Sequence, residues 1–358
     1  MTVEVSYTVL VGAGQVLARQ ESHCRAIETS LRAEGSLHDP SGLLLSMLAP
    51  GAHKALDAGC RAVRLAGQIG AVAAAELTRT IDSYVEADAR VHGDFGRLAS
   101  RIRQTVPAWV DPRVGTGVDA GPGASPAHAV AETTDPRDYL VTPQLGRDEV
   151  HELRQSAASM LGSLDWLATQ FLGFSILDEL VLRPFGGDWQ DVTRAALAWQ
   201  NAASAVAAIS ENVMALTSAT VDAWTGAGGD AFRAAMATAS AAFAGFSRAS
   251  SHVSELLSDI ARVSHLACVT IEQITSSIST QLLILAAEAS IPIAGWASDA
   301  AHTVLVIQDI VTKVRSAQSV IELVIRAINA FLESEVPLGQ ALGVIEDLAD
   351  HVARRAVA

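Results

Sequence analysis

The side chains of this sequence that could do chemistry are scattered, and their spacing is not typical of a catalytic or metal site. His23 and Cys24 are adjacent, and Cys60 could lie near them on a neighbouring helix. A zinc site needs three or four converging ligands, and no ligand spacing supports one here. The glycine-rich stretches 12–14 and 226–229 neither follow a strand pattern nor carry the Lys-Ser/Thr of a phosphate-binding loop. We therefore expect no enzyme activity, no cofactor and no metal.

Two short motifs stand apart from this background. Tyr84 and Asp88 form a Tyr-x-x-x-Asp element whose members share one helix face, because they are four positions apart. Trp224 and Gly226 form a Trp-x-Gly element between two long helical patterns, and glycine suits a turn that needs positive φ. The alternative interpretation is ordinary packing, with Tyr84 in a core beside a solvated Asp88 and Trp224 as a core aromatic before a glycine turn.

Asp88 poses a further choice, because it falls on the apolar face of its helical pattern. A carboxylate at a core position is costly to bury without a partner. Either Asp88 makes a buried polar contact, or the bundle ends near Tyr84 and leaves both side chains on a surface that another protein could recognise.

The composition favours helices over sheets. Of the 358 residues, 50% are hydrophobic but only 5% are aromatic, so the core must be built mainly from small and aliphatic side chains. The net charge of −14 makes a nucleic acid or an anionic membrane a poor partner, since both would repel the chain. The first 15 residues lack the basic start and the long apolar run of a secretory signal, so we expect no export by the general pathway.

Three cysteines, Cys24, Cys60 and Cys268, form neither a Cys-x-x-Cys motif nor a disulfide-rich framework. Cys24 and Cys60 are predicted on adjacent antiparallel helices and could pair in an oxidising compartment. Cysteines of this kind are more often small core residues, and the sequence leaves both options open.

Helical periodicity organises the chain into two long hairpins. The pattern predicts a first helix over 3–34, turns over 36–51, and a second helix over 52–102 whose apolar residues recur every three or four positions. The fold expected is all-α, an elongated antiparallel bundle of two long helical hairpins with extra C-terminal helices. The predicted domains are an N-terminal hairpin (1–105), a linker rich in proline and glycine (106–147), a Trp-x-Gly hairpin with a preceding helix (148–281), and C-terminal helices (282–358).

One apolar stretch raises the question of a membrane. Residues 273–287, 15 in all, carry no charge. Because a spanning helix needs about 20 apolar residues, we expect a core helix here, with conditional membrane insertion as the alternative.

With these patterns in place, the sequence resembles a known family. Trp224 and Gly226 at the tip of a helical hairpin, followed by Asp-Ala-Phe at 230–232, resemble the WxG (Esx-type) substrates of type VII secretion systems in actinobacteria. The first hairpin, with Tyr84 and Asp88, is similar to the partner half of such pairs, as in the Pro-Glu or EspC-type proteins. The linker and the stretch 184–199 resemble the N-terminal helical domain of the mycobacterial channel and necrotising-toxin protein and of related WxG-fused toxins.

The resemblance implies a function and a site. In this family the Tyr-x-x-x-Asp/Glu element is a secretion signal that lies beside the Trp-x-Gly turn, and the secretion ATPase reads both. Tyr84 and Asp88 would be the signal, and Trp224 and Gly226 the adjoining turn, here within one chain. Toxins of this family carry a catalytic domain after the helical region, whereas this sequence stops at Ala358 and its motifs lie mid-sequence. We therefore expect a carrier, an adaptor or a degenerate toxin trunk in place of a complete effector.

The resemblance also implies partners and a location. The expected partners are the type VII secretion ATPase and an Esx-like protein, a toxin or a second copy of the chain. The protein would be secreted or associated with the cell envelope without a cleavable signal peptide. Two alternatives stay open: a membrane-inserting or pore-forming module, and a cytoplasmic chaperone that keeps a neighbouring toxin competent for export.

Overall fold

The computed structural model describes residues 5–91, 130–289, 296–334 and 336–357. These residues are almost entirely helical, and their only extended pairing is a single antiparallel bridge between Val5 and Trp224. The expected all-α class is confirmed. The elements are α1 (Tyr7–Glu34), α2 (Leu43–Val91), the 3₁₀ turn η3 (Pro136–Tyr139), α4 (Glu149–Leu161), α5 (Asp165–Leu172), the π-helical turn η4 (Asp178–Leu182), α6 (Gln190–Ala219), α7 (Ala227–Ala289), α8 (Trp296–Glu333) and α9 (Val336–Val357).

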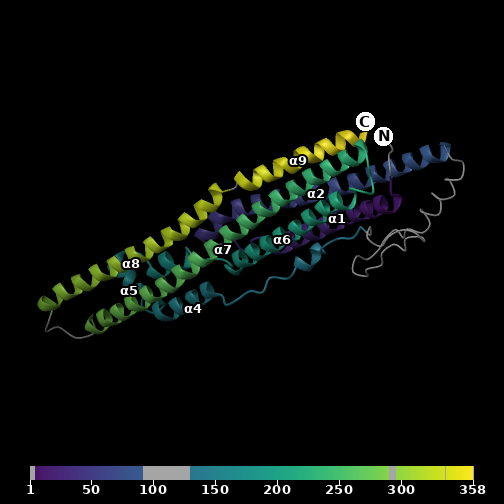
Figure 1. The fold of residues 1–358 in the computed structure, drawn as a ribbon. Helices are drawn as coiled ribbons and strands as arrows, with labels where there is room; N and C mark the ends of the chain where they lie inside the picture. Colours follow the sequence, from purple (N-terminus) through teal and green to yellow (C-terminus); the bar gives the residue numbers. More distant parts are fainter. Residues whose placement is uncertain (1–4, 92–129, 290–295, 335, 358) are drawn as a thin grey trace.

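The molecule is an elongated bundle in which the two predicted hairpins pack against each other within one chain (Figure 1). Helices α1 and α2 form one antiparallel pair, and α6 and α7 form the other. Helix α1 lies against α6, α8 continues along α7, and α9 covers both α2 and α7. Both chain termini lie at the same end of the bundle (Figure 1).

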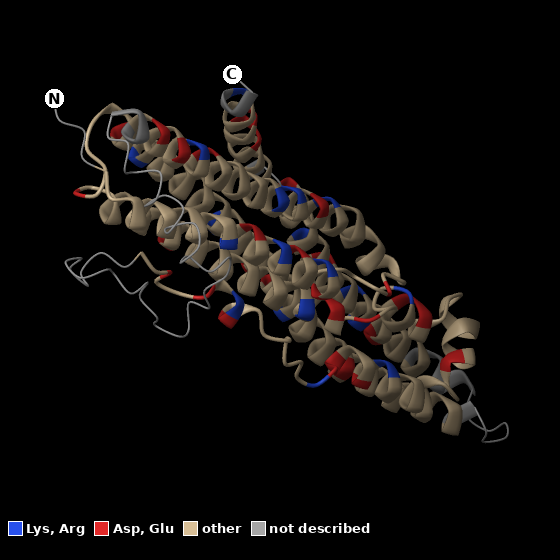
Figure 2. Cartoon of the chain, turned by 90° about the vertical axis from the view of Figure 1, so that its right-hand side faces the viewer, with Lys and Arg blue, Asp and Glu red and all other residues tan. Residues whose placement is uncertain are grey.

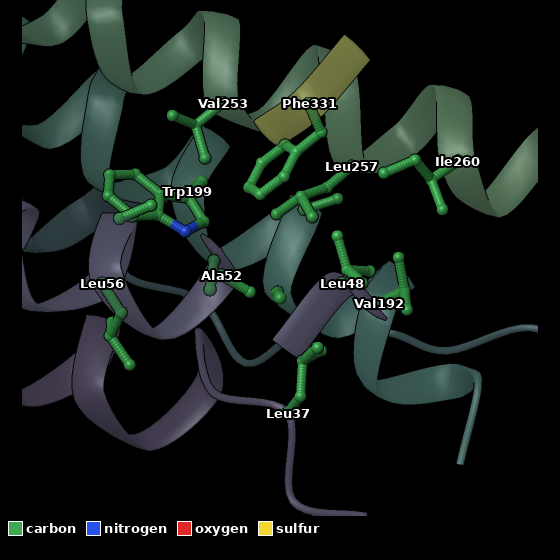
Figure 3. Packing of buried hydrophobic residues seen from close by; sticks show 14 of the residues in the cluster. Leu37, Leu48, Ala52, Leu56, Val192, Trp199, Val253, Leu257, Ile260 and Phe331 are labelled. Carbon is green, nitrogen blue, oxygen red and sulfur yellow. The ribbon is translucent and has the colours of Figure 1, made fainter. Parts of the chain in front are cut away.

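The core follows the periodicity of the sequence. On α2 the seam is buried at Cys60, Val63 and Leu77, as the pattern predicts. Figure 3 shows Trp199 of α6 among buried side chains of α2, α7 and α8. A Cβ at Gly59 would overlap the Trp199 ring, so glycine lets the indole lie against the α2 backbone. Small residues in the seam therefore set how closely the two hairpins approach.

The start of α2 differs from the prediction. Turns were expected over 36–51, but α2 begins at Leu43 and contains Pro50. Proline removes one helical hydrogen bond, yet Leu44, Leu45 and Leu48 are all buried in this first part of the helix. Burying a leucine side chain stabilises by about 1.5–3 kcal/mol, so three of them outweigh the lost bond. The predicted extension of this helix to residue 102 lies outside the described residues beyond Val91.

Later boundaries also shift. Helix α7 continues without a break to Ala289, so the boundary expected between 281 and 282 falls inside a helix. Helix α9 begins at Val336 and includes both Pro337 and Gly339. Proline is tolerated there because the first amides of a helix have no carbonyl partner within it.

At the end of the bundle where α6 begins, two loops cross so closely that their backbones form a hydrogen bond. The amide of Asp188 donates to the carbonyl oxygen of Asp39 at 3.1 Å. Gly42 and Gly187 both have positive φ, 84° and 83°, at this crossing. The buried carboxylate of Asp191 accepts from the amides of His38 and Asp39. These contacts fix the base of one hairpin on the base of the other.

Acidic and basic residues are interspersed along the helices (Figure 2). Among the described helices, none offers an apolar stretch of the length that crossing a bilayer requires.

Candidate recognition site at the Trp224 turn

The turn between α6 and α7 holds the Trp-x-Gly motif in a fixed geometry. The amide of Trp224 donates to the carbonyl oxygen of Thr220 at 3.1 Å, and the amide of Asp230 donates to the carbonyl oxygen of Gly226 at 3.0 Å. Gly226 has a φ of +94°, a conformation that side chains with a Cβ rarely adopt. The motif is therefore the turn itself, as the sequence predicts, and α7 begins directly after it at Ala227.

Two further glycines let the indole lie across the start of α7. A Cβ at Gly229 would overlap the Trp224 carbonyl group, and one at Gly228 would lie 3.1 Å from the Trp224 ring and 3.2 Å from the Tyr84 hydroxyl. These positions leave no room for a larger residue between the indole and the helix backbone.

Trp224 is packed on several sides. Its ring meets Tyr84 edge-on, with centroids 6.3 Å apart and planes at 90°, and meets Phe232 at 5.6 Å. Only 4% of Trp224 is exposed, so the residue is a packed aromatic, as in the alternative interpretation of the motif. The indole Nε1 is buried and has no hydrogen-bond acceptor among the described residues.

Arg233 was not singled out from the sequence, although it holds the turn together. One guanidinium nitrogen donates to the carbonyl oxygens of Thr220 and Trp224, each at 3.0 Å. The other contacts the Asp230 carboxylate at 2.6 Å. Arg233 lies one turn after Asp230 at the start of α7, and this i, i+3 pair was the available signal in the sequence. The carbonyl oxygens of Thr220 and Trp224 could not be identified as acceptors from any sequence pattern.

The N-terminus of the chain closes the other side of the turn. The amide of Ser6 donates to the carbonyl oxygen of Ala223 at 2.7 Å, next to the bridge between Val5 and Trp224. The turn is thus assembled from three separate parts of the chain: the N-terminus, α2 and the connection from α6 to α7.

Of the residues predicted for this site, the structure brings together Tyr84 and the Trp-x-Gly turn. Over residues 43–87 of α2, where the structure describes the side chains, the last buried residue is Leu77, and Tyr84 is half-buried. Burial along this helix therefore declines before Tyr84. Asp88 lies on the same helix, but its side chain lies outside the described residues. The face available to another protein includes Tyr84, Gly226 and Gly228.

The residues considered for a zinc site do not converge. The His23 ring contacts the carboxylate of Glu132 at 3.2 Å, whereas Cys24 lies against the position of Gly67. Within the described ranges no three His, Cys, Asp or Glu side chains are placed to hold a metal ion. Cys24 and Cys60 are both buried and unbonded, so they do not pair in this structure. Burial raises the pKa of the Cys24 thiol to about 12 and that of Cys60 to about 11.

No protein family, curated protein or solved structure was found to match the chain.

Proposed function

We propose that the chain is an Esx-like protein of a type VII secretion system that acts without enzymatic activity, as a carrier or adaptor. Its recognition surface is the end of the bundle where Tyr84 meets the Trp224 turn, and its partner there is the secretion ATPase. The observation that carries the proposal is the edge-on contact between Tyr84 and Trp224. Tyr84 and Trp224 are 140 positions apart in the sequence (224 − 84), and their rings are in contact in the fold.

The architecture of this end supports the proposal. Trp224 is too deeply packed to be the main contact, so its role is to hold the turn and the Tyr84 ring in place. Exposed glycines at 226 and 228 leave the backbone accessible beside that ring. A half-buried tyrosine next to accessible backbone offers a partner both apolar area and hydrogen-bonding groups, a combination common in protein interfaces.

Single-chain assembly also fits an adaptor. In the family that the sequence resembles, the two motifs come from two partner proteins, whereas here the hairpins pack as one bundle. Such a chain would present the complete surface without a partner, so its recognition by the ATPase would not depend on the concentration of a second protein.

Hydrogen exchange with the purified ATPase domains of an actinobacterial type VII system tests the proposal. We expect the amides of residues 80–91 and 221–230 to exchange more slowly in the complex than in the free protein. The Tyr84→Ala variant should bind at least tenfold more weakly, while Trp166→Ala, an exposed aromatic on α5 (62% exposed), should bind as the wild type. Protection elsewhere, or equal binding of the Tyr84 and Trp166 variants, would reject this surface as the site.

A further inference from the structure

Residues 130–147, which we call the strap, lie against α1 and α6, and we call the surface of the two helices that contacts them the groove. A buried carboxylate attaches the strap to α1. The Glu132 side chain is 0% exposed. It accepts a hydrogen bond from Gln20 Nε2 at 2.7 Å and lies 3.2 Å from both Arg19 Nε and His23 Nε2. Burial acts to raise the pKa of Glu132, but the His23 hydrogen bond and the Arg19 charge outweigh it and hold the pKa below its usual range. These contacts on α1 therefore favour an ionised acidic side chain.

The next contact is a set of hydrogen bonds to the backbone of the strap. Asn212 of α6 is buried, and its side-chain oxygen accepts from the amides of Thr133 and Thr134 at 2.8 and 3.2 Å. Its side-chain nitrogen donates to the carbonyl oxygen of Thr134 at 2.8 Å. The side chain of Asn212 thus pairs with both backbone groups of Thr134, which lies in a bend just before η3. Contacts of this kind hold the backbone of a bound segment whatever its side chains are.

Two more amide side chains continue this contact along α6. Asn201 donates to the carbonyl oxygen of Val141 at 2.8 Å, and Gln190 donates to that of Gly146 at 3.2 Å. Gln190, Asn201 and Asn212 are spaced 11 positions apart, which is about three helical turns and places them on one face. The strap runs antiparallel to α6 along this row.

The attachment is specific, but its apolar component is small. Val130 and Leu140 are only partly buried against the core, and Pro136 is buried. The Coulombic gain of a buried ion pair is largely cancelled by the cost of desolvating both charges. The groove therefore discriminates strongly between segments of different sequence, while the net free energy of binding its own strap is modest. A segment held in this way is exchangeable for another of the same chemistry.

We propose that the groove between α1 and α6 is a peptide-binding site for an acidic segment, and that the strap of a second copy of this chain occupies it in exchange. Every copy carries both a strap with the matching sequence and a groove, so exchange yields a complete set of native contacts. The 38 residues 92–129 that precede the strap have a maximum length of about 130 Å, enough to reach a neighbouring molecule. This proposal does not depend on the function proposed above.

The strap of the same molecule binds the groove more readily than the strap of another molecule, because it is attached close by. An attached segment has an effective concentration in the millimolar range, so exchange becomes dominant when the intramolecular contact is broken or the protein is crowded. If one variant has a defective strap and another has a defective groove, neither can form the contact between strap and groove within one molecule. Any such contact in a mixture of the two is then intermolecular.

The test mixes two variants. Glu132→Lys has an intact groove that its own strap no longer fits, and Arg19→Glu has an intact strap that its own groove repels. Each alone should sediment as a monomer, and an equimolar mixture should form a one-to-one complex. The matched control carries both changes, which restores an ion pair of reversed polarity within one chain, and it should remain a monomer with either variant.

A peptide of residues 130–141 provides the second measurement. It should bind the Glu132→Lys variant at least tenfold more tightly than the Arg19→Glu variant, and in wild-type protein it should speed amide exchange in the strap. A mixture that remains monomeric together with a peptide that binds neither variant would overturn the proposal. So would a strap that stays equally protected in both variants, because the polar contacts on α1 would then not be what holds it.

Discussion

The Trp224 turn and the strap groove both join parts of the chain that are far apart in sequence, but they use different chemistry. At the turn, aromatic rings pack against one another edge-on or tilted, and glycines allow close approach. In the groove, a buried carboxylate and amide side chains hold the strap. Apolar packing gains free energy from area removed from water, whereas buried polar contacts mainly penalise the wrong partner. The turn should therefore contribute more to stability, and the groove more to selectivity.

The largest expected effect is at the turn. Trp224→Ala removes a side chain that is 4% exposed and packs on Tyr84 and Phe232. Truncation of a buried tryptophan costs about 3–5 kcal/mol, and urea denaturation should show this loss in the free energy of unfolding. Trp166→Ala is the matched control and should change stability by less than about 0.5 kcal/mol, since it is a surface position. Equal losses would mean that the turn is not a packed centre.

A smaller loss is expected in the groove. Asn212→Ala removes the partly buried hydrogen bonds to the backbone of Thr133 and Thr134. A hydrogen bond of this kind contributes about 0.5–1.5 kcal/mol to stability. Most of this loss should appear as faster amide exchange within residues 130–141. Asn201→Ala, which loses one exposed contact with the Val141 carbonyl oxygen, should have a weaker effect that is confined to the neighbourhood of Val141.

Acid should separate the two regions further. The folded-state pKa of Glu132 lies below its ordinary value, so the ionised pair stabilises the strap above the unfolded pKa and is lost as the pH falls through the lower folded pKa. Limited proteolysis should therefore cut the strap in acid, at and below about pH 4, before the Trp224 turn opens. In Glu132→Gln the cleavage rate should lose this dependence on pH, and an unchanged profile would show that another group controls it.

The smallest expected effect is the absence of a reaction. Burial raises the pKa of the Cys24, Cys60 and Cys268 thiols to about 12, 11 and 12, so almost none is thiolate at pH 8. A thiol reagent should react with none of them in the native protein and with all three after unfolding. Rapid reaction of one cysteine in the native state would show that its helix opens locally.

Much of the fold could be predicted because periodicity records burial directly. The seam that includes Cys60 and Val63 is buried as expected, and the turn at Gly226 begins where its glycine indicates. Pro50 misled the prediction because a local helix-breaking signal is weaker than the burial of the leucines around it.

The site was only partly predictable. The motifs at Tyr84 and Trp224 are short and local, so a resemblance could connect them. The strap could not be found in this way, since Glu132 and His23 are 109 positions apart and the surrounding proline and glycine suggest a plain linker. The spacing of 11 between Gln190, Asn201 and Asn212 was the one signal present, and it has meaning only once the strap is known to lie along α6.

Export tests the central claim most directly. The tagged protein would be expressed in an actinobacterial host with an intact or an ATPase-deleted type VII system, and the amount in the medium compared. We expect ATPase-dependent export of the wild type and of Trp166→Ala, and its loss in Tyr84→Ala while the protein in the cells remains folded. Retention of the wild type in both hosts would contradict the assignment to type VII secretion.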